Sequence, residues 1–348
     1  MIDSFSEKRE GNLTWESENL KLICNFAKNH GVLEYVLLPD KGKGGRNILC
    51  LPKQLLHTVW VMLTPAILSL EFDYAQSFSF PDSQLAAYGT KSDYPIFGGC
   101  NGLDVNMEWL LHNVNFWKYH MLRPAENTLY PSFSALAADK TPRFWRDQLV
   151  NGVSKLGTYW KGSYAYIERE EIDDLRASNG GNIDIQDQFN GDEAQSMFQD
   201  MRLEWIEPDR ATWPQIFEDH LNSLQIPASK ARTRAQHRSA TPEAIAGFRH
   251  QNFQFCGEGC DDSESFLAQG WLNAVPPQED IPGWQRMTMM KYFEDPVTGR
   301  IDEDALWAYE GVVLPGGQII MGRWWSTGDG TDEDMYSGPF ILWCVDGP

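Results

Sequence analysis

The chain of 348 residues carries a formal net charge of −20, and 42% of its residues are hydrophobic. This length is typical of two domains or of one barrel with additions, and the apolar content can fill a large core. The charge disfavours nucleic acid and anionic membranes as partners, because both are bound through Lys and Arg. Aromatic residues make up 13%, including fourteen Trp. Such an excess fits a pocket for a flat organic ligand as well as it fits aromatic-rich strands.

The six cysteines do not form a metal-site pattern, because Cys256 and Cys260 have no second pair at zinc spacing. The polar residues 1–12 lack the apolar core of a signal peptide. Residues 51–70 are the most apolar window, but they contain Lys53 and Pro65. This window is therefore expected to be a buried helix rather than a membrane span. We expect a soluble cytoplasmic protein.

The N-terminal half carries helical signals. Apolar residues at helical spacing predict helices at residues 12–31, 51–70 and 103–122, the second broken near its proline. Thr141-Pro142 predicts the start of a fourth helix, which runs to residue 152. Residues 78–102 are rich in Pro, Gly, Ser and Asp and are expected to be irregular.

From Gly157 onward the apolar period changes to two, the period of β-strands. The first strand has Trp160 and Tyr164 on one face, and the strand at 196–206 has Trp205 on its apolar face. Further strands are predicted at 248–256, 266–275 and 284–293.

Three polar stretches separate the predicted strands. Residues 173–192 are expected to be a hairpin excursion, and residues 212–224 a short helix. The basic segment 228–240 is interpreted as a solvated loop, with a lid over an anionic or polarised ligand as the alternative.

Residues 305–345 give the clearest signal: two aromatic and β-branched runs around the break at 315–317, then a third strand. Trp307 and Tyr309 share one face of the first strand, and Arg323 and Trp325 share one face of the second. We expect these four side chains to face the interior of a barrel. The opposite faces are expected to pack against the N-terminal helices, and they carry Val312, Ile320 and Trp324.

About eight strands with short polar connections predict an α+β protein: N-terminal helices packed on a C-terminal antiparallel β-barrel of about 8–11 strands. The expected organisation is a helical region over residues 1–152, integrated with the barrel, and a barrel over residues 153–348. A small barrel can hold one organic ligand in its mouth.

No catalytic or cofactor motif is present: the chain lacks G-x-S-x-G, H-E-x-x-H and a G-x-G-x-x-G after a strand. The acidic pairs Asp173-Asp174 and Asp261-Asp262 fall in expected loops, where solvated carboxylates are the ordinary interpretation. The sequence implies no cofactor and no metal. An enzyme of this composition would act through shape, hydrogen bonds and acid–base groups in an aromatic cavity.

Four segments together carry a resemblance: WKGSYAY (160–166), MFQDMRLEW (197–205), YEGVVLPGGQIIMGRWW (309–325) and GPFILWCVD (338–346). The pattern resembles fungal proteins with a β-barrel C-terminal half. These are the substrate-receiving barrels of certain F-box proteins and the cofactor-free intermolecular hetero-Diels–Alderases of tropolone–sesquiterpene biosynthesis. Leu51-Pro52 and the leucines after it only faintly match an F-box, which favours the enzyme.

The resemblance implies a reaction. A hydroxymethyl tropolone loses water to give an o-quinone methide, and a humulene-type alkene adds to it to form a dihydropyran. Dehydration needs a proton donor, and cycloaddition needs two apolar partners held together without water. The expected partners are hydrophobic small molecules, with no nucleic acid and no membrane. A ubiquitin-ligase substrate receptor and a non-catalytic carrier of lipophilic ligands remain the alternatives.

The candidate site residues follow from strand faces and side-chain chemistry rather than from a family motif. The catalytic candidates are Arg323, Tyr309, His250 and Lys291. The substrate-binding candidates are Trp160, Tyr164, Trp205, Trp307 and Trp325.

Overall fold

The computed structural model describes residues 52–71, 78–99, 102–125, 127–145, 148–178, 185–189, 198–207, 212–221, 252–261, 264–295, 297–328 and 335–346. The expected helix at 12–31, the basic segment 228–240 and His250 lie outside the described residues.

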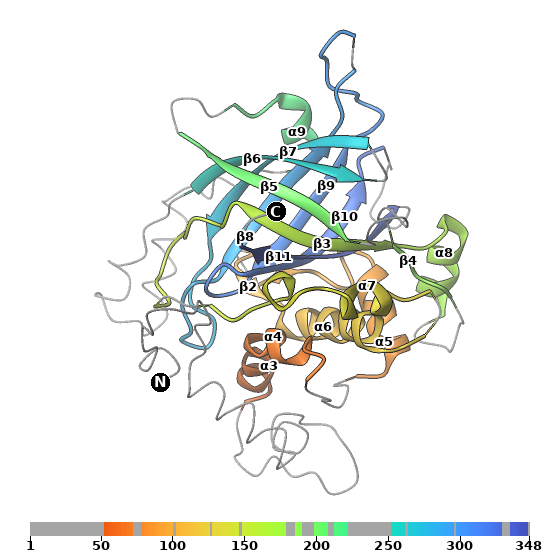
Figure 1. Ribbon diagram of the computed structural model, residues 1–348, viewed down its shortest axis with the longest axis vertical. Coiled ribbons are helices and arrows are strands. Elements are labelled where there is room, and N and C mark those ends of the chain that lie inside the picture. The colour runs from red at the N-terminus through yellow and green to blue at the C-terminus, as the bar shows by residue number, and fades with distance from the viewer. Residues whose placement is uncertain are drawn as a thin grey trace, which may run out of the picture.

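Eight antiparallel strands close into a barrel, because the last strand pairs back with the first (Figure 1). In order around the barrel they are β3 (Tyr159–Tyr166), β5 (Gln199–Ile206), β6 (Asn252–Asp261), β7 (Glu264–Ala274), β8 (Gln285–Tyr292), β9 (Trp307–Val313), β10 (Ile319–Ser326) and β11 (Ser337–Val345). A short strand, β4 (Gln188–Phe189), pairs with the end of β3. The closed barrel confirms the predicted α+β class, and closure removes the unpaired edges of an open sheet.

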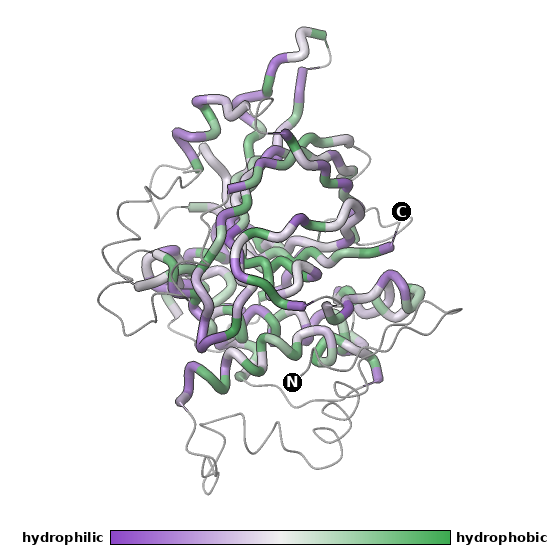
Figure 2. Tube along the Cα trace, turned by 90° about the vertical axis from the view of Figure 1, so that its left-hand side faces the viewer, coloured by the Kyte–Doolittle hydropathy of each residue, from purple (hydrophilic) through white to green (hydrophobic). Residues whose placement is uncertain are grey.

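Most of the helices lie on one side of the barrel, and Figure 2 shows the strands as a ring above them. They are α3 (Lys53–Met62), α4 (Thr64–Ile67), α5 (Phe80–Tyr88), α6 (Met107–Leu122), α7 (Tyr130–Ser134) and the 3₁₀ turn η2 (Ala138–Lys140). A two-strand ribbon, β1 (Phe97–Gly98) with β2 (Asp104–Val105), precedes α6. The predicted break in the 51–70 helix is confirmed, between α3 and α4.

The helices cover the outer face of the last strands. Met321 of β10 and Trp343 of β11 belong to one buried cluster with Trp109 and Trp117 of α6. Val312 of β9 lies in the same cluster, as predicted. Burying side chains of this size contributes roughly 1.5–3 kcal/mol each, so the barrel wall and the helices stabilise one another.

A smaller cluster covers another part of the outer wall. Phe217 of α9 (Gln215–His220) packs with Met290 of β8, Ala308 of β9 and Trp325 of β10. Within the described parts of the chain, none of the helices has the length and apolarity needed to cross a membrane.

The predictions for residues 78–102 and 173–192 are wrong, because capping residues begin a helix within or just before each segment. Residues 78–102 contain α5, which begins after Ser79, whose hydroxyl accepts a hydrogen bond from the Asp82 amide. The segment 173–192 is not a hairpin at its start, because α8 (Arg169–Ala177) runs into it. A capping box between Glu168 and Glu171 begins that helix.

The helix predicted at 141–152 does not form in its described residues. The Lys140 carbonyl accepts a hydrogen bond from the Trp343 indole at 2.8 Å, and Arg143 pairs with Asp346. These contacts hold the segment against the end of β11, and this tertiary contact overrides the local signal of Thr141-Pro142.

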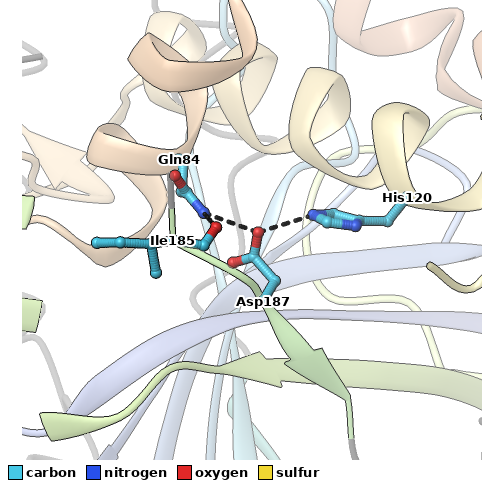
Figure 3. Close-up of polar contacts among 4 residues, drawn as sticks. All are labelled: Gln84, His120, Ile185 and Asp187. Atoms are coloured by element: carbon cyan, nitrogen blue, oxygen red, sulfur yellow. Dashed lines mark hydrogen bonds and ion pairs between the residues drawn. The ribbon is translucent and has the colours of Figure 1, made fainter. Parts of the chain in front are cut away.

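A buried polar cluster joins the helices to β4 (Figure 3). Gln84 donates hydrogen bonds to Asp187 Oδ2 at 2.8 Å and to the Ile185 carbonyl at 3.1 Å. His120 Nε2 lies 3.0 Å from the same carboxylate oxygen, with side-chain exposures of 4% for His120 and 1% for Asp187. Burial, and then the charge of Asp187, raise the pKa of Tyr88 well above its usual value. The cluster therefore holds β4, and with it the end of β3, against α5 and α6.

We predict that Asp187→Ala lowers the free energy of unfolding by about 3 kcal/mol, because it leaves buried donors without their acceptor. The control is Glu108→Ala, which breaks the Lys53–Glu108 pair, whose side chains are 47% and 48% exposed. That loss should stay below about 1 kcal/mol. Urea unfolding measures both values. Equal losses would contradict a structural role for the buried cluster.

His112 of α6 is held neutral. Its ring stacks on Phe78 at a centroid distance of 3.7 Å, and Nδ1 lies 3.3 Å from the Ser83 hydroxyl. Burial lowers the pKa of His112 from 6.5 to about 4. The folded state therefore binds fewer protons than the unfolded state between these two values, and stability falls as pH decreases through this window.

We predict that His112 contributes up to about 3 kcal/mol of stability above pH 6.5, all of which is lost by about pH 4. His112→Asn removes the titrating group while it keeps a polar partner for Ser83. Unfolding free energies measured across this window should fall less steeply in the variant than in the wild type. Parallel pH profiles would contradict the assignment.

Candidate functional site

The register between β9 and β10 decides which side chains face the barrel interior. Trp324 lies opposite Tyr309, and Ile320 lies opposite Val313. Directly opposed residues of antiparallel strands share a face, and Tyr309 belongs to the interior cluster. Trp324 and Ile320 therefore point inward, so the prediction that they pack against the helices is wrong.

Arg323 and Trp325 consequently lie on the outer wall, and the prediction that they face the interior is wrong. Arg323 is 1% exposed and donates a hydrogen bond to the Tyr94 carbonyl at 3.1 Å. Its guanidinium carbon Cζ lies 5.4 Å from the ring centroid of Trp109. The Nζ atom of Lys91 lies 3.2 Å from the ring centroid of Trp325. Alternation correctly indicates that Arg323 and Trp325 share a face, but it does not indicate which face is inside.

An aromatic cavity of about 230 Å³ lies at one mouth of the barrel, where β8 ends and β9 begins. Seven of its eight lining residues are aromatic, and the eighth is a lysine. They are Tyr164, Tyr166, Lys291, Phe293, Trp307, Tyr309, Trp324 and Tyr336. Four of the predicted site residues meet here: Tyr164, Lys291, Trp307 and Tyr309.

Trp324 lies at the centre of the aromatic contacts. Its ring makes edge-to-face contacts with Tyr164, Trp307 and Tyr336 at centroid distances of 5.8, 5.4 and 5.3 Å. Its indole N–H donates to the Ala165 carbonyl at 3.1 Å. Because both the ring face and the N–H are engaged, the orientation of the indole is fixed.

Gly338 makes this arrangement possible. A Cβ atom at this position would lie 3.0 Å from the Trp324 indole nitrogen and would collide with the Ala165 carbonyl oxygen. Any residue larger than glycine at position 338 would therefore push Trp324 away from β3 and break its hydrogen bond to the Ala165 carbonyl.

Lys291 supplies the positive charge of the cavity. Its side chain is 4% exposed, and Nζ lies 4.5 Å from the Phe266 ring centroid, 5.1 Å from Tyr164 and 5.8 Å from Phe293. Aromatic faces stabilise a cation at such distances. An ammonium group placed here can donate hydrogen bonds to an oxygen atom of a bound ligand.

Tyr336 is a neutral phenol at the edge of the cavity. Its hydroxyl donates a hydrogen bond to the Ile167 carbonyl at 3.2 Å. Burial first, and then the nearby Glu168 carboxylate, raise the pKa of Tyr336 to about 12. The phenol therefore stays protonated at neutral pH.

The remaining predicted residues lie elsewhere. Trp160 is buried and donates to the Gly157 carbonyl at 2.8 Å. Trp205 contacts Phe253 edge to face at 5.5 Å, close to the end of β5 that lies away from the cavity.

Trp160 also lines a larger depression of about 510 Å³ across β3, β5, β6 and β7. Its rim carries Asp200 and Glu258, whose side chains are 68% and 63% exposed. The smaller aromatic cavity is the better candidate, because four of the predicted site residues, among them the buried Lys291, line it together.

Sequence reasoning missed four lining residues: Tyr166, Phe293, Trp324 and Tyr336. Alternation could have found Tyr166 from Tyr164, and Phe293 from Lys291, since each lies two positions farther along. Trp324 could not be found from alternation, because only the pairing register between β9 and β10 shows which face of β10 is inside.

Comparisons with protein families, with characterised proteins and with solved structures give no match for this chain.

We predict that Trp324→Ala lowers the free energy of unfolding by about 3–5 kcal/mol, because it removes three ring contacts and a buried hydrogen bond. Trp324→Phe keeps an aromatic ring and should cost about half as much. Urea unfolding compares the two variants. If they are equally destabilised, ring packing is not what holds the mouth together.

Proposed function

We propose that the mouth cavity binds a flat organic molecule that bears oxygen, and that the protein is a cofactor-independent enzyme acting on it. The observation that carries this proposal is the buried Lys291 amine in a cavity whose other lining residues are all aromatic. Aromatic walls hold a planar ring by stacking, while the lysine orients its oxygen.

The reaction we assign to this site is the hetero-Diels–Alder addition that the resemblance implies. A hydroxymethyl tropolone loses its hydroxyl group and a proton as water and becomes an o-quinone methide. The terminal carbon and the carbonyl oxygen of that species then form two bonds to an alkene carbon pair, which gives a dihydropyran. Both steps conserve atoms and electrons and need no redox partner.

Lys291 would act in the first step. Its ammonium can donate a proton or a hydrogen bond to the departing hydroxyl, or stabilise the negative charge that develops on the tropolone oxygen. The aromatic walls would exclude the water that quenches a quinone methide. The second step needs mainly that the two partners be held together, which lowers the entropic barrier.

The size of the cavity supports an occupant with a single ring. A volume of about 230 Å³ is below the roughly 300–1,000 Å³ of pockets for drug-sized ligands. It therefore suits the ring-bearing partner alone. The terpene alkene would approach that ring from the open side of the mouth.

The substrate-receptor alternative is disfavoured by α3 and α4. An adaptor would have to contact apolar residues of this segment, yet Leu56, Trp60 and Val61 are at most 1% exposed. They pack in the same cluster as Trp109 of α6. The carrier alternative shares the cavity with the enzyme and differs only in turnover.

We predict that tropolone quenches the tryptophan fluorescence of the protein, because Trp307 and Trp324 line the cavity.

With a hydroxymethyl tropolone and humulene, the protein should form the dihydropyran faster than buffer does, as followed by chromatography and mass spectrometry. Lys291→Met should lower this rate about 10²-fold, the typical loss for one transition-state donor.

The matched control is Lys155→Met, which removes an exposed lysine before β3 and should leave the rate unchanged. Quenching without turnover would support the carrier. If the protein shows neither fluorescence quenching by tropolone nor turnover, the proposed site is wrong.

A further inference from the structure

We propose that Arg176 of α8 is a positioning residue of the mouth cavity, which holds Tyr336 in place as one of its walls without touching a ligand. The inference rests on the proposed function only in taking this cavity as the ligand site. It gives a role to α8, because none of the residues of this fully described helix lines the cavity.

Tyr336 stands at an end of β11 that is paired on one side. The register pairs between β11 and β10 begin at Ser337, the residue after Tyr336. Those between β11 and β3 begin only at Phe340. In the described pairing, the first residues of β11 are therefore held by β10 alone, and a strand end with fewer ladder bonds opens more easily.

Arg176 supplies further contacts at this end of the strand. Its Nη2 atom donates hydrogen bonds to the Met335 carbonyl at 3.0 Å and to the Ser337 hydroxyl at 3.3 Å. Its Nε atom donates to the carbonyl of Tyr88, the last residue of α5, at 3.1 Å. One planar guanidinium group therefore ties both neighbours of Tyr336 to a helix of the core.

The start of α8 contacts the tyrosine itself. The Tyr336 hydroxyl donates to the Ile167 carbonyl, two residues before α8, and Cζ of Arg169 lies 5.6 Å from the centre of the Tyr336 ring. The same ring makes its edge-to-face contact with Trp324 at 5.3 Å. Tyr336 is thus held by α8 and packed on the central indole of the cavity, so a shift of Tyr336 would change the shape of the cavity.

Arg143 is a matched control, because it contacts the opposite end of the same strand. It pairs with Asp346, the residue after β11, and neither of these two described residues lines the mouth cavity. Replacing either arginine by methionine removes a charge and polar contacts from one end of β11. Only Arg176 is bonded to the residues on both sides of Tyr336.

The first experiment measures tropolone binding to the full chain by tryptophan fluorescence. Arg176→Met should raise the Kd about tenfold, because a cavity that is formed about a tenth of the time binds its ligand correspondingly more weakly. Arg143→Met leaves the cavity formed, so its Kd should stay within about twofold of the wild type. Arg176→Lys should resemble Arg176→Met, since one ammonium group cannot reach α5 and both β11 contacts together. Full rescue by lysine would mean that charge rather than geometry matters, and the positioning role would be wrong.

The second experiment needs no ligand and reports on Tyr336 directly. Tetranitromethane nitrates phenolates, and burial raises the pKa of Tyr336 to about 12, so its nitration should be slow in the wild type. In Arg176→Met the ring gains access to water and its pKa falls towards about 10. Nitration of Tyr336, mapped by peptide mass spectrometry with Tyr130 of α7 as the internal reference, should then be at least about tenfold faster. Arg143→Met should leave it unchanged.

The two readouts separate this inference from the proposed function. If tropolone binds the wild type and Arg176→Met with equal affinity, the positioning role is wrong and the function stands. If nitration of Tyr336 accelerates in Arg176→Met while tropolone does not bind the wild type, the ligand site is wrong and the contact between Arg176 and Tyr336 stands.

A milder variant keeps the test decisive if Arg176→Met does not fold. Arg176→Gln retains a single amide donor, so it should shift both readouts in the same direction by a smaller factor. Wild-type affinity and wild-type nitration in Arg176→Gln would contradict the proposal.

Discussion

The pairing register of β10 against β9 is the constraint on which the site depends. Gly311 and Gly322 lie opposite each other in this register. A Cβ atom on either glycine would come within 2.8 Å of the Phe340 ring, so the two together leave room for that ring inside the barrel. A slip of one residue would reverse every inward and outward side chain of β10. It would remove Trp324 from the cavity and bury a charged Arg323 in the barrel interior.

The same complementarity between glycines and large side chains fills the rest of the barrel. Leu203 packs where a side chain at Gly257 would stand, and the ring of Phe255 does the same at Gly270. Small barrels are commonly filled by such alternation of small and large residues. Leu203 and Phe255 thus fill the space beside these two glycines, and the aromatic cavity at the mouth holds only about 230 Å³. That favours recognition of one ring over transport of a long lipophile.

The sequence predicted the strands well because period-two alternation is a local property, and it placed Tyr164, Lys291, Trp307 and Tyr309 among the candidates. It failed for Arg323, since alternation groups residues by face without saying which face is inside. The missing information is the register across the turn, where Gly316 and Gly317 adopt positive φ angles of 88° and 68°. Tertiary contacts of this kind cannot be read from one strand alone. The helical half failed at residues 78–102 and 141–152 for different reasons, a local cap in the first case and contacts with β11 in the second.

Electrostatics connects the cavity to the chemistry proposed for it. A net charge of −20 repels anions at a distance, so a ligand that arrives as an anion is disfavoured by the protein as a whole. Lys291 acts only at short range, because rings surround it. The combination therefore favours a neutral molecule on which charge develops after binding. Dehydration of a neutral alcohol has this property, whereas storage of an organic anion does not.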